Sequence, residues 1–203
     1  MSDKIASHYR ALLREHGDSA ESAQYSSRET QERRFKYLIQ IGSLDGARVL
    51  DFGCGTAHLA TYLSQCGIRA KYTGVDVVEE FLEVAGAKHP GHRFGRFEEF
   101  SDERFDFVFV SGVFNNKRRG NRKFYQDSLI KLYQRCDRGL AFNMMSFYVD
   151  YRDPELFYEN PERTFSFVKH NLTPFAVLRH DYAVKPETVP FEFIIYAYRN
   201  PPS

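Results

Sequence analysis

The sequence has no tryptophan and only three cysteines, Cys54, Cys66 and Cys136, among its 203 residues. This odd and scattered set provides neither a disulfide framework nor the paired spacing of a structural metal site. We therefore expect reduced thiols. Because no cluster of histidines and carboxylates has metal-ligand spacing either, we expect no metal.

An excess of one charge and long apolar runs are also lacking. The 28 Lys and Arg residues are balanced by 27 Asp and Glu residues, so no global field would concentrate a nucleic acid. No run approaches the roughly 20 apolar residues that span a bilayer, and residues 1–17 are too polar for a signal peptide. The sequence predicts a cytoplasmic protein without a nucleic-acid or membrane partner.

What the sequence does contain is an alternation of short apolar or aromatic runs with helix-like stretches. Parallel strands need crossovers, and each crossover helix buries one sheet face, so this alternation predicts an α/β fold with a parallel sheet covered on both faces. No helix is expected between the last two strands, which predicts a terminal antiparallel hairpin. The expected strands are 47–52, 71–75, 92–94, 105–110, 139–144, 174–178 and 191–198, and the expected helices between them are 57–66, 78–87, 122–135 and 162–170.

Two further helices are expected before the first strand. Apolar residues between positions 5 and 13 have helical spacing, and Gly17 can end that helix. Ser26 and Glu29 have the spacing of a capping box, which predicts a second helix from Ser26. We expect residues 1–46 to form a helical cap and residues 47–203 the main domain, together one compact unit.

A glycine loop in the segment RVLDFGCGTA follows the first expected strand. Gly53 and Gly55 let a ligand approach the backbone, and Thr56 can cap the next helix. No G-K-[ST] sequence is present, so a phosphate-binding P-loop is not favoured. Asp51 suits a ligand with ammonium and sulfonium groups, and Asp76, at the end of the next strand, can accept hydrogen bonds from ribose hydroxyls. The predicted ligand is nucleoside-like and poor in phosphate.

Three motifs in order resemble the class I S-adenosylmethionine-dependent methyltransferase family over residues 48–199. VLDFGCGTA resembles its first motif, GVD its ribose acid, and FDFVFVSGVFN its fourth-strand motif beside the methyl donor. The segments SGVFN, FNMMSFYVDY, LFYENP and RHDY further resemble a subgroup of small bacterial methyltransferases of poorly defined substrate. The resemblance implies a Rossmann-like sheet of seven strands, with helices on both faces and an antiparallel last strand, and S-adenosylmethionine as cofactor.

The same resemblance implies a set of cofactor-binding residues. After the third strand the family often has an acid beside the adenine, whereas this chain reads FGRFEEF. Either Arg96 takes that place, with Phe97 at the ring, or Glu98 does. We interpret Cys54 as a small filler of the loop rather than a nucleophile. The implied cofactor-binding residues are Asp51, Gly53, Cys54, Gly55, Asp76, Val77, Arg96, Phe97, Ser111 and Gly112.

An acceptor pocket is expected where the chain leaves the fourth and fifth strands. Asn115 and Asn116 precede five basic residues within 117–123, which either bind a phosphate or carboxylate of the acceptor or form an ordinary solvated loop. After the fifth strand, Asn143, Tyr148 and Tyr158 either contact a sugar-like or carboxylated acceptor or belong to aromatic packing.

Catalytic residues are not fixed by the sequence, because methyl transfer from a sulfonium mainly needs alignment and exclusion of water. The candidates are His180, Asn115 and Tyr148. His180 can act as a base oriented by Asp181, but adjacent residues on a strand face opposite sides, which favours a structural role. If the N-terminal helices fold over the donor, its methionine carboxylate can meet one of four side chains, Tyr25, Arg28, Gln31 or Arg34.

The leading hypothesis is methyl transfer from S-adenosylmethionine to a small molecule. Alternatives are a noncatalytic nucleoside-binding or protein-binding module on the same fold, and an RNA or protein methyltransferase. Intact acids and glycines in the first two motifs argue against the former, and the balanced charge argues against the latter. An NAD-dependent dehydrogenase is opposed by Asp51 before the glycines and by the missing third glycine.

Overall fold

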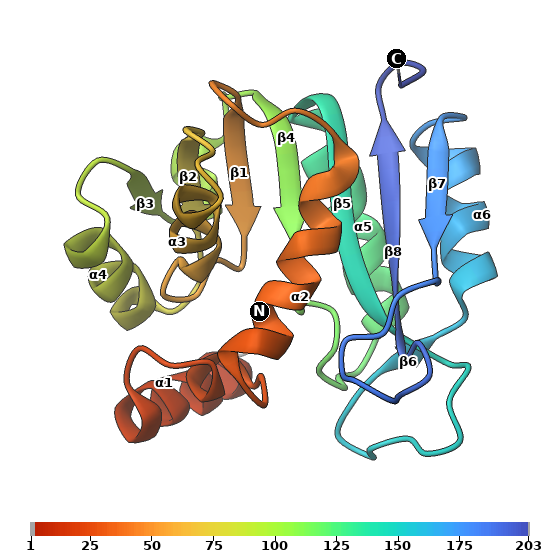
Figure 1. Ribbon diagram of the computed structural model, residues 1–203, viewed down its shortest axis with the longest axis horizontal. Helices are drawn as coiled ribbons and strands as arrows, with labels where there is room; N and C mark the ends of the chain where they lie inside the picture. The colour runs from red at the N-terminus through yellow and green to blue at the C-terminus, as the bar shows by residue number, and fades with distance from the viewer. Residues whose placement is uncertain (1–2, 203) are drawn as a thin grey trace.

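A computed structural model describes residues 3–202 as one eight-stranded sheet with helices packed around it (Figure 1). The strands are β1 (Arg48–Phe52), β2 (Lys71–Val75), β3 (Arg93–Gly95), β4 (Phe105–Val110), β5 (Cys136–Ser146), β6 (Tyr158–Glu159), β7 (Ala176–Arg179) and β8 (Glu192–Tyr198). The helices are α1 (Asp3–His16), α2 (Arg28–Leu38), α3 (His58–Gln65), α4 (Glu79–Lys88), α5 (Asn121–Gln134) and α6 (Pro161–Asn171), with short 3-10 turns η1 (Glu21–Ala23), η2 (Ile39–Ile41) and η3 (Phe97–Phe100).

The strand order is β3-β2-β1-β4-β5-β8-β7, with β6 paired to β5 off this path. β8 runs antiparallel to both β5 and β7, and the other pairs are parallel. The predicted α/β fold with a mostly parallel sheet and a terminal antiparallel hairpin is therefore confirmed. The order reverses between β1 and β4, and ligands of open α/β sheets bind outside the carboxyl ends of the strands at such a point.

Three local predictions were wrong. The sheet has an eighth strand, β6, which is only two residues long and so carries no readable alternation. Helix α2 is capped by Ser27 rather than Ser26, since the Ser27 hydroxyl accepts a hydrogen bond from the Thr30 amide at 3.2 Å. Thr56 does not cap α3: the chain makes its left-handed turn at Ala57, with φ of 58°, and no side chain caps this end.

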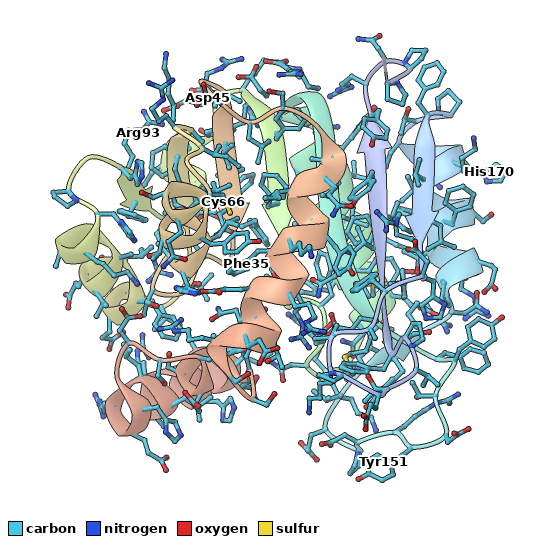
Figure 2. The ribbon with its side chains drawn as sticks, viewed as in Figure 1. Phe35, Asp45, Cys66, Arg93, Tyr151 and His170 are labelled. Carbon is cyan, nitrogen blue, oxygen red and sulfur yellow. The ribbon has the colours of Figure 1, made fainter. Side chains whose placement is uncertain are left out.

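Both faces of the sheet are buried, because successive residues of β1, β4 and β5 point to opposite sides. One core contains Val49, Phe107 and Ala141 and packs against α2 and α3. The other contains Leu50, Val108 and Phe142 and packs against α5 and α6. Figure 2 shows Phe35, labelled on α2; its ring centroid lies 5.8 Å from that of Tyr62 on α3. These two cores hold the parallel strands in place and leave their carboxyl ends as the edge from which loops extend.

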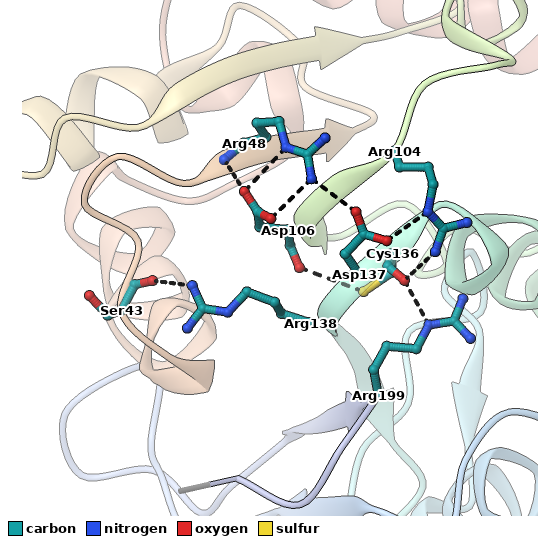
Figure 3. A network of polar contacts seen from close by, with 8 residues as sticks. All are labelled: Ser43, Arg48, Arg104, Asp106, Cys136, Asp137, Arg138 and Arg199. Atoms are coloured by element: carbon teal, nitrogen blue, oxygen red, sulfur yellow. Dashed lines mark hydrogen bonds and ion pairs between the residues drawn. The ribbon is translucent and has the colours of Figure 1, made fainter.

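The amino ends of β1, β4 and β5 are joined by a polar network (Figure 3). Arg48 bridges Asp106 and Asp137 with Nη2 to carboxylate oxygen distances of 3.1 and 2.9 Å, and Arg104 Nε lies 2.6 Å from Asp137. Arg199, after β8, donates from Nε to the Cys136 carbonyl oxygen at 2.6 Å. Single exposed ion pairs stabilise little, but this network ties four chain segments together at one edge of the sheet.

The N-terminal segment runs from the opposite edge to one face of the sheet (Figure 1). Helix α1 contacts α4 through an ion pair between Arg10 Nε and Glu80 at 3.0 Å, and through the rings of Tyr9 and Phe81, whose centroids are 6.1 Å apart. Asn116 Nδ2, after β4, donates to the Tyr9 hydroxyl at 2.7 Å. The N-terminal helix is thus joined to loops at the carboxyl edge. Across residues 3–202, none of the helices combines the length and apolarity needed to span a membrane.

Candidate active site

A cavity of about 310 Å³ opens at the carboxyl ends of the central strands. Its walls come from the glycine loop after β1, the end of β2, the loop after β4 and the N-terminal segment. A second cavity of about 220 Å³ shares Gly53, Asp76, Val77, Val113 and Phe124 with the first. Both lie at the point where the strand order reverses, which is the expected place for a ligand in this architecture.

The glycine loop has two glycines with different surroundings. A Cβ added to Gly53, which has φ of +80°, would lie 2.3 Å from Val113 Cγ2. A Cβ added to Gly55, with φ of +53°, would have no atom within 4 Å. Gly53 is therefore required by packing against the loop after β4, whereas Gly55 leaves an open face on the cavity that a ligand can approach.

Asp76 joins the end of β2 to the glycine loop. Its carboxylate accepts hydrogen bonds from the backbone amides of Gly55, Val77 and Val78 at 2.9, 2.7 and 3.0 Å. Burial raises the pKa of Asp76, although these amides act in the opposite direction. Because each carboxylate oxygen has two acceptor sites, the side chain can still accept hydrogen bonds from a ligand in the cavity.

Asp51 is a second acid in the cavity wall, only 4% exposed. The Tyr72 hydroxyl donates to its Oδ2 at 2.6 Å. Burial raises the pKa of Asp51 to about 7, and the nearby charge of Asp76 acts in the same direction. A cationic group in the cavity would stabilise the ionised form of Asp51, so this site is poised to accept an ammonium or sulfonium ligand.

This raised pKa predicts a pH-dependent stability. The folded state binds the Asp51 proton more tightly than the unfolded state does. The contribution of this proton to the free energy of unfolding is therefore present at low pH and is lost as pH rises through about 7. We expect Asp51→Asn to gain stability relative to the wild type between pH 5 and pH 8, by about 2 kcal/mol. Urea unfolding of the ligand-free protein at several pH values measures this difference.

Asp45→Asn is the matched control, because hydrogen bonds from the Arg69 amide and side chain lower the pKa of Asp45. The stability of Asp45→Asn relative to the wild type should not rise with pH over the same range, as that of Asp51→Asn does. Parallel stability curves for Asp51→Asn and the wild type from pH 5 to pH 8 would contradict the expected titration.

A buried ion pair connects the N-terminal segment to the sheet below the cavity. Arg34 of α2 binds Glu192 of β8, with Nε to carboxylate oxygen distances of 2.9 and 3.0 Å. Arg34 is 7% exposed and Glu192 is fully buried. Asn143 of β5 donates from Nδ2 to Glu192 at 2.7 Å and accepts from the Gly112 amide at 2.9 Å. The ion pair therefore positions the loop after β4 through Asn143.

Tyr25 lies between this ion pair and the loop after β4. The Arg34 guanidinium carbon is 4.9 Å from the centroid of the Tyr25 ring, and the Tyr25 hydroxyl is 3.2 Å from Ser111 Oγ. Tyr25, Gln31 and Arg34 line the larger cavity. Arg28, expected beside them, donates instead to the Asp18 carbonyl oxygen at 2.7 Å.

Most sequence-predicted residues come together in these walls. Asp51, Gly53, Cys54, Gly55, Asp76, Val77, Ser111, Gly112, Asn115 and Asn116 line the larger cavity. Phe97 and Glu98 line the smaller one, where Phe97 packs edge-on against Phe52 with ring centroids 5.6 Å apart. Arg96 lines neither, because its guanidinium pairs with Glu79 at 3.5 Å. Of the two arrangements open from the sequence, this geometry favours Glu98 over Arg96 beside Phe97.

Four other predicted residues lie outside the cavity lining. Asn143 is fully buried and bonded at both ends of its amide, as described above. The Tyr148 hydroxyl donates to Glu162 at 2.8 Å, and the Tyr158 hydroxyl accepts from the Asp153 amide at 3.1 Å. His180 Nε2 lies 3.1 Å from the Pro190 carbonyl oxygen, and Asp181 binds Arg179 instead. Each side chain has a protein partner, which favours the alternative structural role over contact with an acceptor.

The structure also adds wall residues that the sequence did not indicate. Met145, at the end of β5, and Leu156 and Phe191, from two later segments, supply apolar surface. Lys185 supplies positive charge, next to Arg118 from the basic segment 117–123 that the sequence had already indicated. These residues are far apart in the sequence and belong to no shared motif, so only the topology brings them together.

Comparisons with known proteins find similarity to methyltransferases. Residues 50–128 match the family model described as "Methyltransferase domain". The chain is 28% identical over 158 residues to "Putative methyltransferase Rv1506c" of Mycobacterium tuberculosis, covering 73% of this chain and 95% of that protein. Magnesium protoporphyrin IX methyltransferase (ChlM) from Synechocystis PCC 6803, solved with bound SAH, has a TM-score of 0.66 at 15% identity, over 96% of this chain and 94% of that one.

Together these likenesses support a class I S-adenosylmethionine-dependent methyltransferase. This methyltransferase also has the fold of the [4+2]-cyclase SpnF, with a TM-score of 0.57 and 15% identity over 77% of this chain and 61% of that one. At this identity the likeness concerns the fold alone.

The methyltransferase cavity fits the cofactor of its family, S-adenosylmethionine. The open face of Gly55 leaves room at the loop, and the buried Asp51 and the half-buried Asp76 line the same cavity. When bound, the cofactor supplies an electrophilic methyl group. Within residues 3–202, no group of three or more His, Cys, Asp or Glu side chains is arranged to hold a metal ion.

Proposed function

We propose that the chain transfers the methyl group of S-adenosylmethionine to a small-molecule acceptor, either sugar-like or carboxylated. The observation that carries this proposal is the pair of adjoining cavities at the carboxyl edge of the sheet. One wall presents an open glycine loop, the buried Asp51 and the half-buried Asp76. Much of the rest of the larger cavity comes from the N-terminal segment and from segments after β4, β5 and β7. The methyl donor and the acceptor would thus bind to different walls of the same pair of cavities.

The donor residues are assigned by their chemistry. Asp76 would accept hydrogen bonds from the ribose hydroxyls, and Asp51 would face the ammonium or sulfonium charge. Phe97 and Glu98, in the smaller cavity, would contact the adenine by ring packing and by a hydrogen bond to its amino group. Gly53 and Gly55 would let the ligand lie against the backbone.

The acceptor would lie against Met145, Leu156 and Phe191, whose apolar surfaces favour an organic molecule over a solvated chain. The residues of the chain would align the acceptor and exclude water, which are the main requirements of this displacement. In this proposal, residues 1–46 act as a cap on a methyltransferase domain of residues 47–203. Tyr9 in the cap already contacts Asn116 in the loop after β4.

The first test is calorimetric titration of the purified chain with S-adenosylmethionine and S-adenosylhomocysteine, with NAD as the negative control. We expect micromolar binding of the sulfur nucleosides, on the order of −8 kcal/mol. Asp76→Ala should weaken it by about 2 kcal/mol, because it removes charge-assisted hydrogen bonds to the ribose.

Asp76→Asn tests whether weaker binding comes from lost hydrogen bonds to the ligand or from a disordered glycine loop. Its amide oxygen can still accept a hydrogen bond from the Gly55 amide and so keep the loop ordered. Asp102→Ala is the matched control, because Asp102 is exposed and outside both cavities. If the folded wild type binds neither sulfur nucleoside, the proposal is rejected and a noncatalytic nucleoside-binding or protein-binding module becomes the better explanation.

A second candidate is a reaction without methyl transfer, since the same fold occurs in a protein named as a [4+2]-cyclase. In that case the chain would bind the donor but leave it unconsumed. Incubation with S-adenosylmethionine and a panel of small sugars, phenols and carboxylic acids separates the two candidates. Formation of S-adenosylhomocysteine that depends on an acceptor supports methyl transfer, and binding without conversion supports the second candidate.

A further inference from the structure

Two buried polar atoms in the loop after β4 have no hydrogen-bond partner within residues 3–202: Asn115 Oδ1 and Arg118 Nη1. Both residues line the larger cavity. Buried polar groups are nearly always satisfied, and an exception in a cavity wall points to a ligand or water that completes it. The two atoms have complementary roles, because Asn115 Oδ1 accepts hydrogen bonds and Arg118 Nη1 donates them.

Arg118 differs from the other basic residues in its segment. Arg122 binds Glu159 at 2.7 Å, Lys123 binds Asp127 at 2.9 Å, and Lys117 Nζ donates to the Pro154 carbonyl oxygen at 3.1 Å. The Arg118 guanidinium lies over the Phe124 ring, 4.1 Å from its centroid, and has no ion pair with a carboxylate in the part of the chain that the structure describes. Its planar face is thus fixed while its donors at the cavity stay available.

A second cation lines the same cavity from another segment. Lys185 lies in the connection between β7 and β8, is exposed, and makes no ion pair within residues 3–202. Figure 1 shows this connection and the loop after β4 at the same edge of the sheet. The cavity therefore has positive charge on two segments that come from different strands.

The acids of the cavity do not neutralise these cations. Asp51 accepts from the Tyr72 hydroxyl, Asp76 accepts from three backbone amides, and Glu192 is bound by Arg34. None of the three forms an ion pair with Arg118 or Lys185. The unmatched positive charge can be met by an anionic ligand, and a guanidinium fork suits the paired oxygens of a carboxylate or phosphate.

We infer that the methyl acceptor carries an oxyanion group that binds Arg118 and Lys185, with a neighbouring hydroxyl or amine that donates to Asn115 Oδ1. This inference rests on the proposed function, which supplies the donor half of the cavity. The Asn116 to Leu156 bridge joins this loop to the segment after β5, next to the apolar surface that Met145 and Leu156 give the cavity. We therefore assign the oxyanion to the acceptor. The carboxylate of the donor is the other anion that could bind Arg118 and Lys185, and the experiment must distinguish the two.

The experiment titrates benzoate and its neutral analogue benzamide into the chain saturated with S-adenosylhomocysteine. We expect benzoate to bind at least about tenfold more tightly than benzamide, because only benzoate presents an anion to the two cations. Arg118→Gln and Lys185→Gln should each weaken benzoate binding, by about tenfold for Arg118, without weakening S-adenosylhomocysteine. Phenyl phosphate in place of benzoate shows whether the site prefers phosphate or carboxylate.

Arg119→Gln is the matched control, since Arg119 is exposed in the same basic segment and lies outside the cavity lining. It should leave benzoate binding unchanged. Arg118→Lys keeps the charge and should recover part of the affinity, which separates lost charge from lost packing on Phe124.

Equal binding of benzoate and benzamide by the wild type would overturn the inference. So would a tenfold loss of S-adenosylhomocysteine affinity in Arg118→Gln, because Arg118 would then serve the donor; that result leaves the proposed function intact. Failure of the wild type to bind S-adenosylhomocysteine at all would be a failure of the proposed function itself, and it is detected before any benzoate is added.

Discussion

Replacing Arg34 with alanine is expected to lower the free energy of unfolding by about 3–5 kcal/mol, as is usual when one partner of a buried ion pair is removed. The reason is that Glu192, which is fully buried, would keep its charge with only Asn143 as a partner. The neighbouring amide of Gly112 depends on the same Asn143 side chain, so the loop after β4 should loosen as well. Urea unfolding followed by circular dichroism measures the loss.

Arg33→Ala is the matched control, because Arg33 is the adjacent residue of α2 and pairs with Glu29 at 2.9 Å on the exposed helix surface. Such a pair contributes only about 0.3–0.5 kcal/mol. The double variant Arg34→Met with Glu192→Leu removes both charges, and it should recover much of the lost stability. If Arg34→Ala were no more destabilising than Arg33→Ala, the buried pair would not have the structural role assigned to it.

Replacing Gly53 with alanine is expected to cost about 3 kcal/mol of stability and to abolish donor binding. The backbone at Gly53 has φ of +80°, where a side chain is strained, and the new Cβ would lie 2.3 Å from Val113 Cγ2. Val113 lines both cavities, so its displacement would change the donor wall as well as the fold. Unfolding experiments and titration with S-adenosylhomocysteine report the two effects separately.

Gly46→Ala separates the cost of backbone strain at positive φ from the cost of the steric clash with Val113. Gly46 has φ of +72°, close to that of Gly53, but a Cβ there would meet no atom within 4 Å. It should therefore show only the backbone cost of about 1–2 kcal/mol and retain donor binding. Similar losses in the two variants, with donor binding preserved in both, would mean that the contact between Gly53 and Val113 is not important.

Much of the fold could be predicted because the information is local. β2 and β4 were predicted with the bounds found in the structure, since their apolar runs end at clear turn residues. The helices after β1 were predicted within one residue at each end. β6 was missed because a two-residue strand is defined by its partner, β5, rather than by its own sequence. The cap at Ser27 was misplaced by one residue because Ser26 and Ser27 have the same side chain.

The residues at the ends of β1 and β2 were predicted to lie together because they belong to compact motifs. The rest of the cavity could be predicted only in part: the basic segment with Arg118 was indicated, whereas Met145 and Lys185 come from segments that only the tertiary structure brings to it. For Asn143 the sequence left open contact with an acceptor or packing; β5 is long and central, and the side chain is buried against Glu192. Whether a polar residue near a strand end faces a ligand or the core depends on register, which the sequence alone did not provide.

The polar network at the amino ends of β1, β4 and β5 has a consequence for how this chain can change over time. Arg48, Arg104 and Arg199 hold these strands at the edge away from the cavity. Residues 147–157 and 180–191 leave from the other edge, and among residues 3–202 none of their hydrogen bonds reaches this network. Apart from the core residues Tyr182 and Val184, these loops can therefore diverge in sequence while the anchored edge of the sheet is inherited unchanged.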